Sequence, residues 1–221
     1  MEVKKMDRLI TEASKFLSGA PFRWAFCGGY ALDLFLDRTM RIHGDIDICV
    51  FENDRDTILR YMLQNNWRVY EFRGQGKVRP LDDASASDAG RNIMCVKGEC
   101  DLVKFYPSED AGVLYHEFFH IGIRSFHYLE FLFSKKGKNQ FVFDEEKDIR
   151  RDLSKAILFN GDIPYLAPEI ALLYKSSQVE RGESYSDFEQ IYPHMSDEQK
   201  EWFSQKLDIL YPGGHQWRVC G

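Results

Sequence analysis

The chain has 221 residues, of which 44% are hydrophobic and 29% charged, and its formal net charge is −6. This length suits one large domain or two small ones, and the composition excludes a disordered tail, a collagen-like fibre and a disulfide-stapled miniprotein. The acidic balance argues against a main role in nucleic-acid binding, which depends on clustered Lys and Arg.

The cysteine pattern and the hydropathy of the chain indicate where in the cell the protein is located. Five cysteines, an odd number without a CxxC pair, indicate free thiols. The N-terminus has no apolar run typical of a signal peptide, and no stretch approaches the ~18–20 apolar residues of a membrane span. These features predict a cytoplasmic protein without a membrane partner.

Hydrophobic periodicity predicts an alternation of helices and strands in the first part of the chain. The expected elements, in order, are a helix over 3–17, a buried strand over 23–27, a short helix over 30–36, a strand over 46–50, a helix around 58–63 and a strand over 67–72. Gly, Pro, Asp and Ser dominate residues 73–90, which predicts a long mobile loop.

Further strands and then helices are expected. Residues 91–96 and 99–106 are typical of a hairpin that turns at Lys97-Gly98, and 118–143 predicts one or two more strands. Helices are predicted from Pro168, over 184–192, and after Ser196, where Gln199 completes a capping box. A mixed α/β part, residues 1–163, therefore precedes a helical part, residues 164–221.

Two glycines and two aspartates form the segment with the strongest chemical signal. Gly28 and Gly29 end a predicted strand and open a helix, and such a turn lets backbone N–H groups approach a phosphate. Asp45 and Asp47 lie two residues apart on a strand, so both carboxylates project from one face, roughly 6–7 Å apart. A divalent metal between them would neutralise two like charges; a solvated edge strand is the alternative.

A third acid strengthens the metal interpretation. Asp101 stands on a predicted strand, and pairing of that strand with 46–50 would place it beside Asp45 and Asp47. Three carboxylates suit a two-metal site that binds a nucleoside triphosphate.

The full pattern resembles a known family. Gly-Gly-Tyr-Ala-Leu-Asp, then Arg-x-His-x-Asp-Ile-Asp after a long spacer, is similar to the aminoglycoside 2″-adenylyltransferase and lincosamide nucleotidyltransferase branch of the DNA polymerase β-type nucleotidyltransferases. Residues 163–175 resemble the start of the helical domain of that family. The resemblance implies an α+β fold, with a small mixed β-sheet nucleotidyltransferase core flanked by helices and followed by a C-terminal helical bundle.

The resemblance also implies roles for individual residues. Gly28 and Gly29 would support the triphosphate, and Asp45 and Asp47 would bind Mg²⁺. Asp101 would bind metal or accept the proton of the acceptor hydroxyl.

Lys175, His43 and Arg41 are further candidates for nucleotide binding. Lys175 would face the phosphates from the helical part. His43 either bonds to backbone in a turn or orients Asp45 or a phosphate, and Arg41 pairs with Asp33 or with phosphate; both alternatives remain open at this point.

The implied activity is a nucleotidyltransferase, most simply an adenylyltransferase. It would move a nucleoside monophosphate from ATP or another triphosphate to a hydroxyl of a small molecule, with release of pyrophosphate and dependence on Mg²⁺. The resemblance suggests aminoglycoside-like or lincosamide-like acceptors and hence antibiotic resistance; the negative charge of the chain suits a cationic acceptor, and a nucleic-acid acceptor is not expected.

Two other functions are compatible with the sequence. The chain is alternatively a non-catalytic nucleotide-binding or interaction module of the same fold. His116-Glu117-x-x-His120 also matches the HExxH string of zinc hydrolases, which requires a helix, whereas the surrounding aromatic residues favour a strand.

Overall fold

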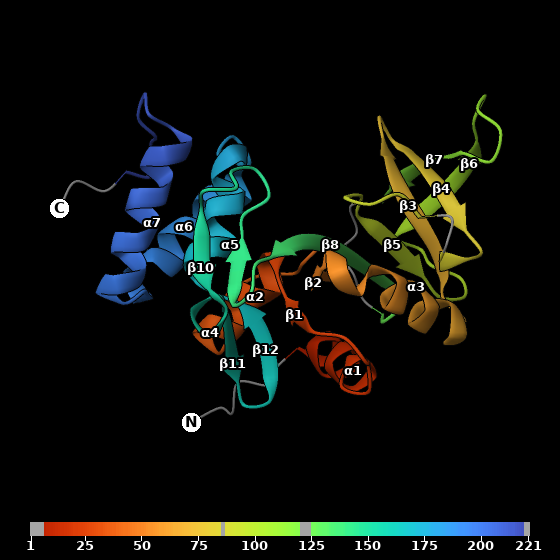
Figure 1. Ribbon diagram of the computed structural model, residues 1–221, viewed down its shortest axis with the longest axis horizontal. Coiled ribbons are helices and arrows are strands. Elements are labelled where there is room, and N and C mark those ends of the chain that lie inside the picture. Colours follow the sequence, from red (N-terminus) through yellow and green to blue (C-terminus); the bar gives the residue numbers. More distant parts are fainter. Residues whose placement is uncertain (1–6, 85–86, 120–124, 219–221) are drawn as a thin grey trace.

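The computed structural model describes residues 7–84, 87–119 and 125–218, and it confirms an α+β protein. The helices that follow residue 167 lie at one end of the molecule and strands β3 to β7 at the other, with β2 and β8 between them (Figure 1). The sheet is larger than the small core expected, because it gains strands that the sequence patterns did not predict.

The strands belong to one connected mixed sheet. They are β1 Trp24–Phe26, β2 Asp47–Phe51, β3 Arg68–Gly74, β4 Lys77–Leu81, β5 Ile93–Val96, β6 Val103–Pro107, β7 Leu114–Phe118, β8 Tyr128–Lys136, β9 Gln140–Val142, β10 Arg150–Asp152, β11 Ile157–Asn160 and β12 Ile163–Leu166. Their order is β11-β12-β1-β2-β8-β5-β3-β4-β7-β6, and β9 joins β8 to β10. β1 runs parallel to β12 and β2 runs parallel to β8.

The helices form where apolar residues recur on one face and where the ends are capped. They are α1 Arg8–Leu17, α2 Gly28–Leu36, α3 Arg55–Gln64, α4 Leu153–Ala156, α5 Pro168–Lys175, α6 Gly182–Ile191 and α7 Asp197–Leu210. In α1, the Asp7 carboxylate accepts the N–H of Leu9. The capping box predicted at Ser196 and Gln199 is confirmed, with both of its hydrogen bonds present.

One local prediction is wrong and another is only partly right. The strands on either side of Lys97-Gly98 do not form a hairpin, because β5 pairs with β3 and β8 whereas β6 pairs with β7. The expected loop 73–90 contains strand β4, and the buried Glu71 holds part of the remainder: its carboxylate accepts from the hydroxyl of Ser87 at 3.1 Å and the N–H of Asp88 at 2.6 Å.

The helical part continues directly from the sheet. β12 spans the boundary expected between residues 163 and 164 and pairs with both β1 and β11, and α5 begins two residues after it. The division into two domains stays a prediction.

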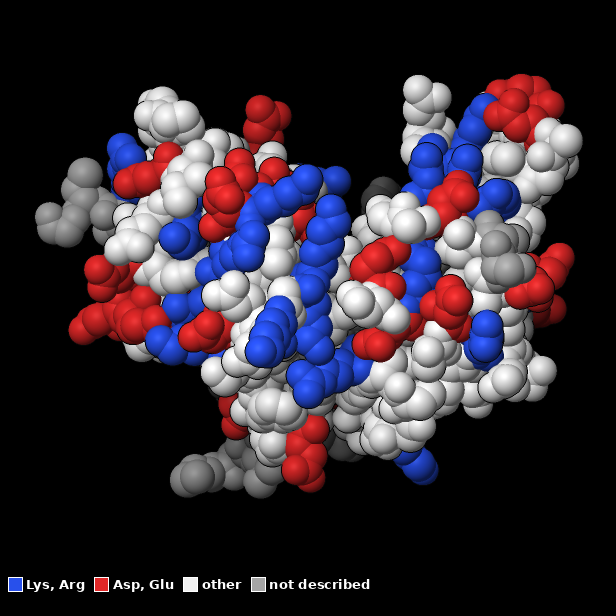
Figure 2. Space-filling model, viewed as in Figure 1, with Lys and Arg blue, Asp and Glu red and all other residues white. Residues whose placement is uncertain are grey.

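Surface charge is mixed. On the face drawn in Figure 2, Lys and Arg gather in a band across the middle, with Asp and Glu on both sides of it. None of the helices in the described ranges is long and apolar enough to cross a membrane. Cys27, Cys49, Cys95 and Cys100 are free thiols, as predicted.

Candidate active site

The Gly28-Gly29 turn lies directly against the strand that carries Asp47. Cys27, between β1 and α2, donates its N–H to the carbonyl of Asp47 at 2.9 Å. Gly28 has φ +59°, and a Cβ built on it would overlap the carboxylate of Asp47. Because Gly28 has no side chain, the start of α2 packs directly against the carboxylate of Asp47. The N–H groups of the first turn of a helix have no carbonyl partner within the helix, so they can donate to a ligand beside this carboxylate.

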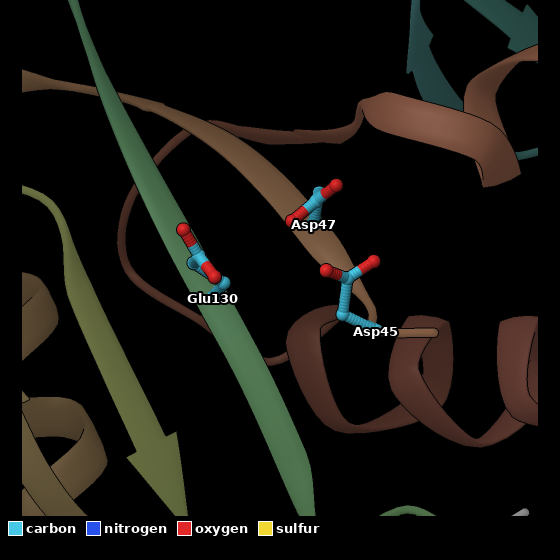
Figure 3. A group of neighbouring side chains, drawn as sticks. All are labelled: Asp45, Asp47 and Glu130. Carbon is cyan, nitrogen blue, oxygen red and sulfur yellow. The ribbon is translucent and has the colours of Figure 1, made fainter. Parts of the chain in front are cut away.

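Three carboxylates converge next to this turn. One oxygen each from Asp45, Asp47 and Glu130 lies within 4.8 Å of the other two, and Figure 3 shows the three side chains turned toward a common space. Asp47 stands opposite Glu130 in the parallel pairing of β2 with β8, and Glu130 donates its N–H to the carbonyl of Ile46 at 2.9 Å. The register of two neighbouring strands thus builds the group, which we call the carboxylate trio.

Burial and mutual repulsion disfavour ionisation of the trio. Burial, and then the charges of Asp45 and Glu130, raise the pKa of Asp47 well above its ordinary value. Burial and the neighbouring Asp45 raise the pKa of Glu130 to about 7, although the hydroxyl of Tyr128 donates to its Oε2 at 3.0 Å. Burial also raises the pKa of Asp45. A hard divalent cation prefers such oxygen ligands and would remove the repulsion, so the donor set fits Mg²⁺.

His43 and Asp33 form a buried pair beside the turn. The Nε2 of His43 donates to Oδ2 of Asp33 at 2.8 Å, and Oδ1 of Asp33 accepts the N–H of Met40 at 3.0 Å. A Cβ on Gly29 would overlap the imidazole of His43 at Nδ1, a buried atom for which the described residues provide no partner. His43 thus bonds neither to backbone nor to Asp45, and Asp33 pairs with His43 rather than with Arg41.

Lys175 and Arg41 meet at the carboxylate of Asp187. Nζ of Lys175 lies 2.9 Å from Oδ2 of Asp187, and Nη2 of Arg41 lies 3.4 Å from the same oxygen. The positive charge of Lys175 lowers the pKa of Asp45 and of Asp47, against the larger effect of burial. The charges of both side chains act on Asp45, so both lie near the trio, and their role in nucleotide binding stays a prediction.

Asp101 is not part of this site. It lies in the exposed turn before β6, and β6 stands at the far end of the sheet order from β2, whose neighbours are β1 and β8. The expectation that its strand would pair with 46–50 is wrong. Sequence reasoning missed Glu130 as the third acid, although a lone acid among Tyr128, Leu129 and Phe131 is a signal in the sequence.

The HExxH string does not lie on a helix. His116 and Glu117 belong to strand β7, where successive side chains point to opposite faces, and His120 lies outside the described residues. The arrangement required for a zinc hydrolase is therefore contradicted.

One comparison with known proteins covers the part of the chain that holds the Gly28-Gly29 turn and the two aspartates. A family model described as aminoglycoside-2''-adenylyltransferase matches residues 9–97, which include both glycines, Asp45 and Asp47. No curated protein matches the sequence.

Solved structures share the fold. The solution structure of the antibiotic-resistance factor ANT(2'')-Ia has a TM-score of 0.52 at 12% identity, covering 93% of this chain and 92% of that one. A crystal structure of ANT(2'')-Ia in complex with adenylyl-2''-tobramycin gives 0.52 at 13% identity, covering 93% and 99%. The lincomycin-bound lincosamide antibiotic adenylyltransferase LnuA gives 0.51 at 10% identity, covering 84% and 96%.

The family match and the shared fold confirm the resemblance that the sequence motifs indicated. The matching family model supports an enzyme of the nucleotidyltransferase type. The roles of individual site residues stay predictions.

Proposed function

We propose that this protein is a Mg²⁺-dependent nucleotidyltransferase that moves a nucleoside monophosphate, most simply AMP from ATP, to a hydroxyl of a small molecule. The observation that carries the proposal is the convergence of Asp45, Asp47 and Glu130 beside the Gly28-Gly29 turn. Carboxylates that hold a divalent cation next to free helix N–H groups are suited to a triphosphate.

The trio would hold a two-metal Mg²⁺ site. When bound, Mg²⁺ neutralises charge on the triphosphate and on the leaving group. The first turn of α2 would bind phosphate oxygens through its N–H groups, and Lys175 and Arg41 would offset the remaining negative charge. Glu130 takes the place predicted for Asp101.

The reaction follows from this arrangement. The acceptor oxygen attacks the α-phosphorus in line, the bond from the α-phosphorus to the bridging oxygen breaks, and pyrophosphate leaves with that oxygen. The proton of the acceptor hydroxyl passes to the carboxylate of Glu130. Holding both reactants in line supplies much of the rate acceleration, because it removes the entropic cost of their encounter.

For the acceptor, we propose an aminoglycoside-like or lincosamide-like molecule, which would make drug resistance the biological role. The description of the matching family model and the ligands named for the two structural neighbours support this class. The net charge of −6 suits a cationic acceptor. The free thiols support a cytoplasmic location. No role for nucleic acid is proposed.

Thermal unfolding with each nucleoside triphosphate, with and without Mg²⁺, tests the proposal. A ligand at 100 times its dissociation constant adds about 2.7 kcal/mol, which corresponds to a rise of roughly 5–10 °C in a chain of this size. The rise should require Mg²⁺ and should vanish in the Asp45→Asn, Asp47→Asn double variant. Pyrophosphate release with a panel of aminoglycosides and lincosamides then identifies the acceptor, and binding without release for any acceptor would favour a non-catalytic module.

A further inference from the structure

Asp187 is a fully buried aspartate on α6 that gathers the two cations of the site. Its side chain has no exposed surface, and its carboxylate receives Nζ of Lys175 at 2.9 Å and Nη2 and Nε of Arg41 at 3.4 and 3.5 Å. A buried carboxylate is costly unless it is paired, so these contacts account for its presence. Glu183, one turn earlier on α6, lies 3.6 Å from Arg41 but is 70% exposed.

The two cations come from different parts of the chain. Lys175 is the last residue of α5, and Arg41 lies in the segment that leads from α2 to Asp45. Asp187 adds a third segment, α6, and α6 packs against both α5 and α2. One carboxylate therefore fixes a lysine and an arginine that approach the trio from separate elements.

Both cations stay with Asp187 instead of pairing with the trio. Across residues 7–84, 87–119 and 125–218, neither Lys175 nor Arg41 forms an ion pair with Asp45, Asp47 or Glu130. Yet the trio is close enough for the charge of Lys175 to act on Asp45 and Asp47.

Without the carboxylate of Asp187, the ammonium of Lys175 would be drawn toward other nearby carboxylates. Its ammonium is a compact charge on a flexible stem, and the attraction between unit charges rises steeply in partly buried surroundings. The trio offers alternative partners, because its three carboxylates converge and the charge of Lys175 already acts on Asp45 and Asp47. An ammonium seated among them would occupy the place of the metal.

We propose that Asp187 is a positioning residue that holds Lys175 and Arg41 away from Asp45, Asp47 and Glu130, so that the trio stays open to Mg²⁺ while both cations remain available to the phosphates. The inference rests on the proposed function, because it assumes that the trio binds Mg²⁺. Asp187 acts through Lys175 and does not itself touch the reacting atoms.

The test is a Mg²⁺ titration followed by thermal unfolding, at a fixed ATP concentration and also with Mg²⁺ alone. Asp187→Asn keeps the shape of the side chain but removes its charge. The Mg²⁺ concentration for half-maximal stabilisation should rise at least roughly fivefold, the lower end of usual couplings between sites. Glu189→Gln, the same charge change at an exposed position of α6, is the matched control and should leave it unchanged.

A second variant separates positioning from a merely structural role. Adding Lys175→Met to Asp187→Asn removes the ammonium that would compete with Mg²⁺, so the requirement for Mg²⁺ alone should fall back toward the wild-type value. The double variant lacks the ammonium that Asp187 neutralises in the wild type, so it should fold even if Asp187→Asn alone does not. The test then remains available. A requirement that stays raised in the double variant, and also after Arg41→Gln is added to it, would overturn the inference.

The remaining outcomes are also decisive. If the wild type responds to Mg²⁺ with ATP but Asp187→Asn matches Glu189→Gln, the inference fails and the proposed function stands. If the wild type shows no Mg²⁺-dependent response with any nucleotide, the proposed function fails, and the inference fails with it.

Discussion

Replacing Glu130 by Gln should stabilise the metal-free protein at high pH. In the folded chain the pKa of Glu130 is raised from 4.5 to about 7, first by burial and then by the charge of Asp45. A folded-state pKa above the unfolded value means that the folded chain keeps a proton that the unfolded chain has already lost. Stability therefore falls as the pH rises from about 4.5 to 7, and the full penalty applies above pH 7.

The size of the effect follows from the same values. The difference between the folded and the ordinary pKa corresponds to roughly 3 kcal/mol at pH 8, since each pH unit is worth about 1.36 kcal/mol. Gln has no charge to bury, and its carbonyl oxygen still accepts from the hydroxyl of Tyr128. In a chain of this length, 3 kcal/mol raises the unfolding midpoint by roughly 6–12 °C.

The assay is thermal unfolding of wild type and Glu130→Gln in EDTA at pH 5 and pH 8. In EDTA, the variant should be more stable than wild type at pH 8 and nearly equal to it at pH 5. In a separate assay without EDTA, the variant should lose the stabilisation that Mg²⁺ and nucleotide give the wild type. Glu189→Gln, an exposed charge-matched control, should change neither midpoint. A variant that is less stable than wild type at pH 8, or equally stabilised at both pH values, would refute the reasoning.

Three further predictions concern Gly28, Asp101 and Glu198. Gly28→Ala forces a Cβ against Asp47 at a residue with left-handed backbone, so it should lower the free energy of unfolding by at least ~1–2 kcal/mol. It should also abolish Mg²⁺-dependent nucleotide binding in a thermal-shift assay. Gly44→Ala is the control and should retain that binding, because a Cβ at Gly44 meets nothing within 4 Å. Asp101→Asn should leave the nucleotide response unchanged, because the residue lies in an exposed turn before β6; a lost response would restore it to the site. A hydrogen bond from Arg151 lowers the pKa of Glu198 to about 2, so this pair should contribute up to ~1 kcal/mol above pH 4.5 and lose it as the pH falls toward 2. The free energy of unfolding should therefore decrease less steeply between pH 4.5 and pH 2 for Glu198→Gln than for wild type. Identical slopes would contradict this prediction.

The sequence predicted the parts of the site that are close together along the chain. Gly28 and Gly29 follow a short strand, and Asp45 and Asp47 fall on one face of the next, so local spacing was enough to place them. The third acid depended on which strand lies beside β2. That neighbour is β8, which follows β2 after five other strands, and no local pattern encodes such a pairing.

Other features had no usable local signal. Asp187 stands in a short amphipathic helix like any surface aspartate, and its burial arises only where α6 meets Lys175 and Arg41. The loop expected at 73–90 contains few apolar residues, and Ser87 and Asp88 within it are held instead by hydrogen bonds to Glu71, a buried acid on β3. Both cases depend on tertiary contacts between polar groups, which hydrophobic periodicity does not report.

A crystal of the protein soaked with Mn²⁺ and a non-hydrolysable ATP analogue tests the central claim most directly. Mn²⁺ replaces Mg²⁺ among oxygen ligands and is located by its anomalous scattering. The account predicts two anomalous peaks beside the carboxylates of Asp45, Asp47 and Glu130, with the phosphates against the first turn of α2. A peak elsewhere, or a nucleotide bound away from Gly28 and Gly29, would contradict it.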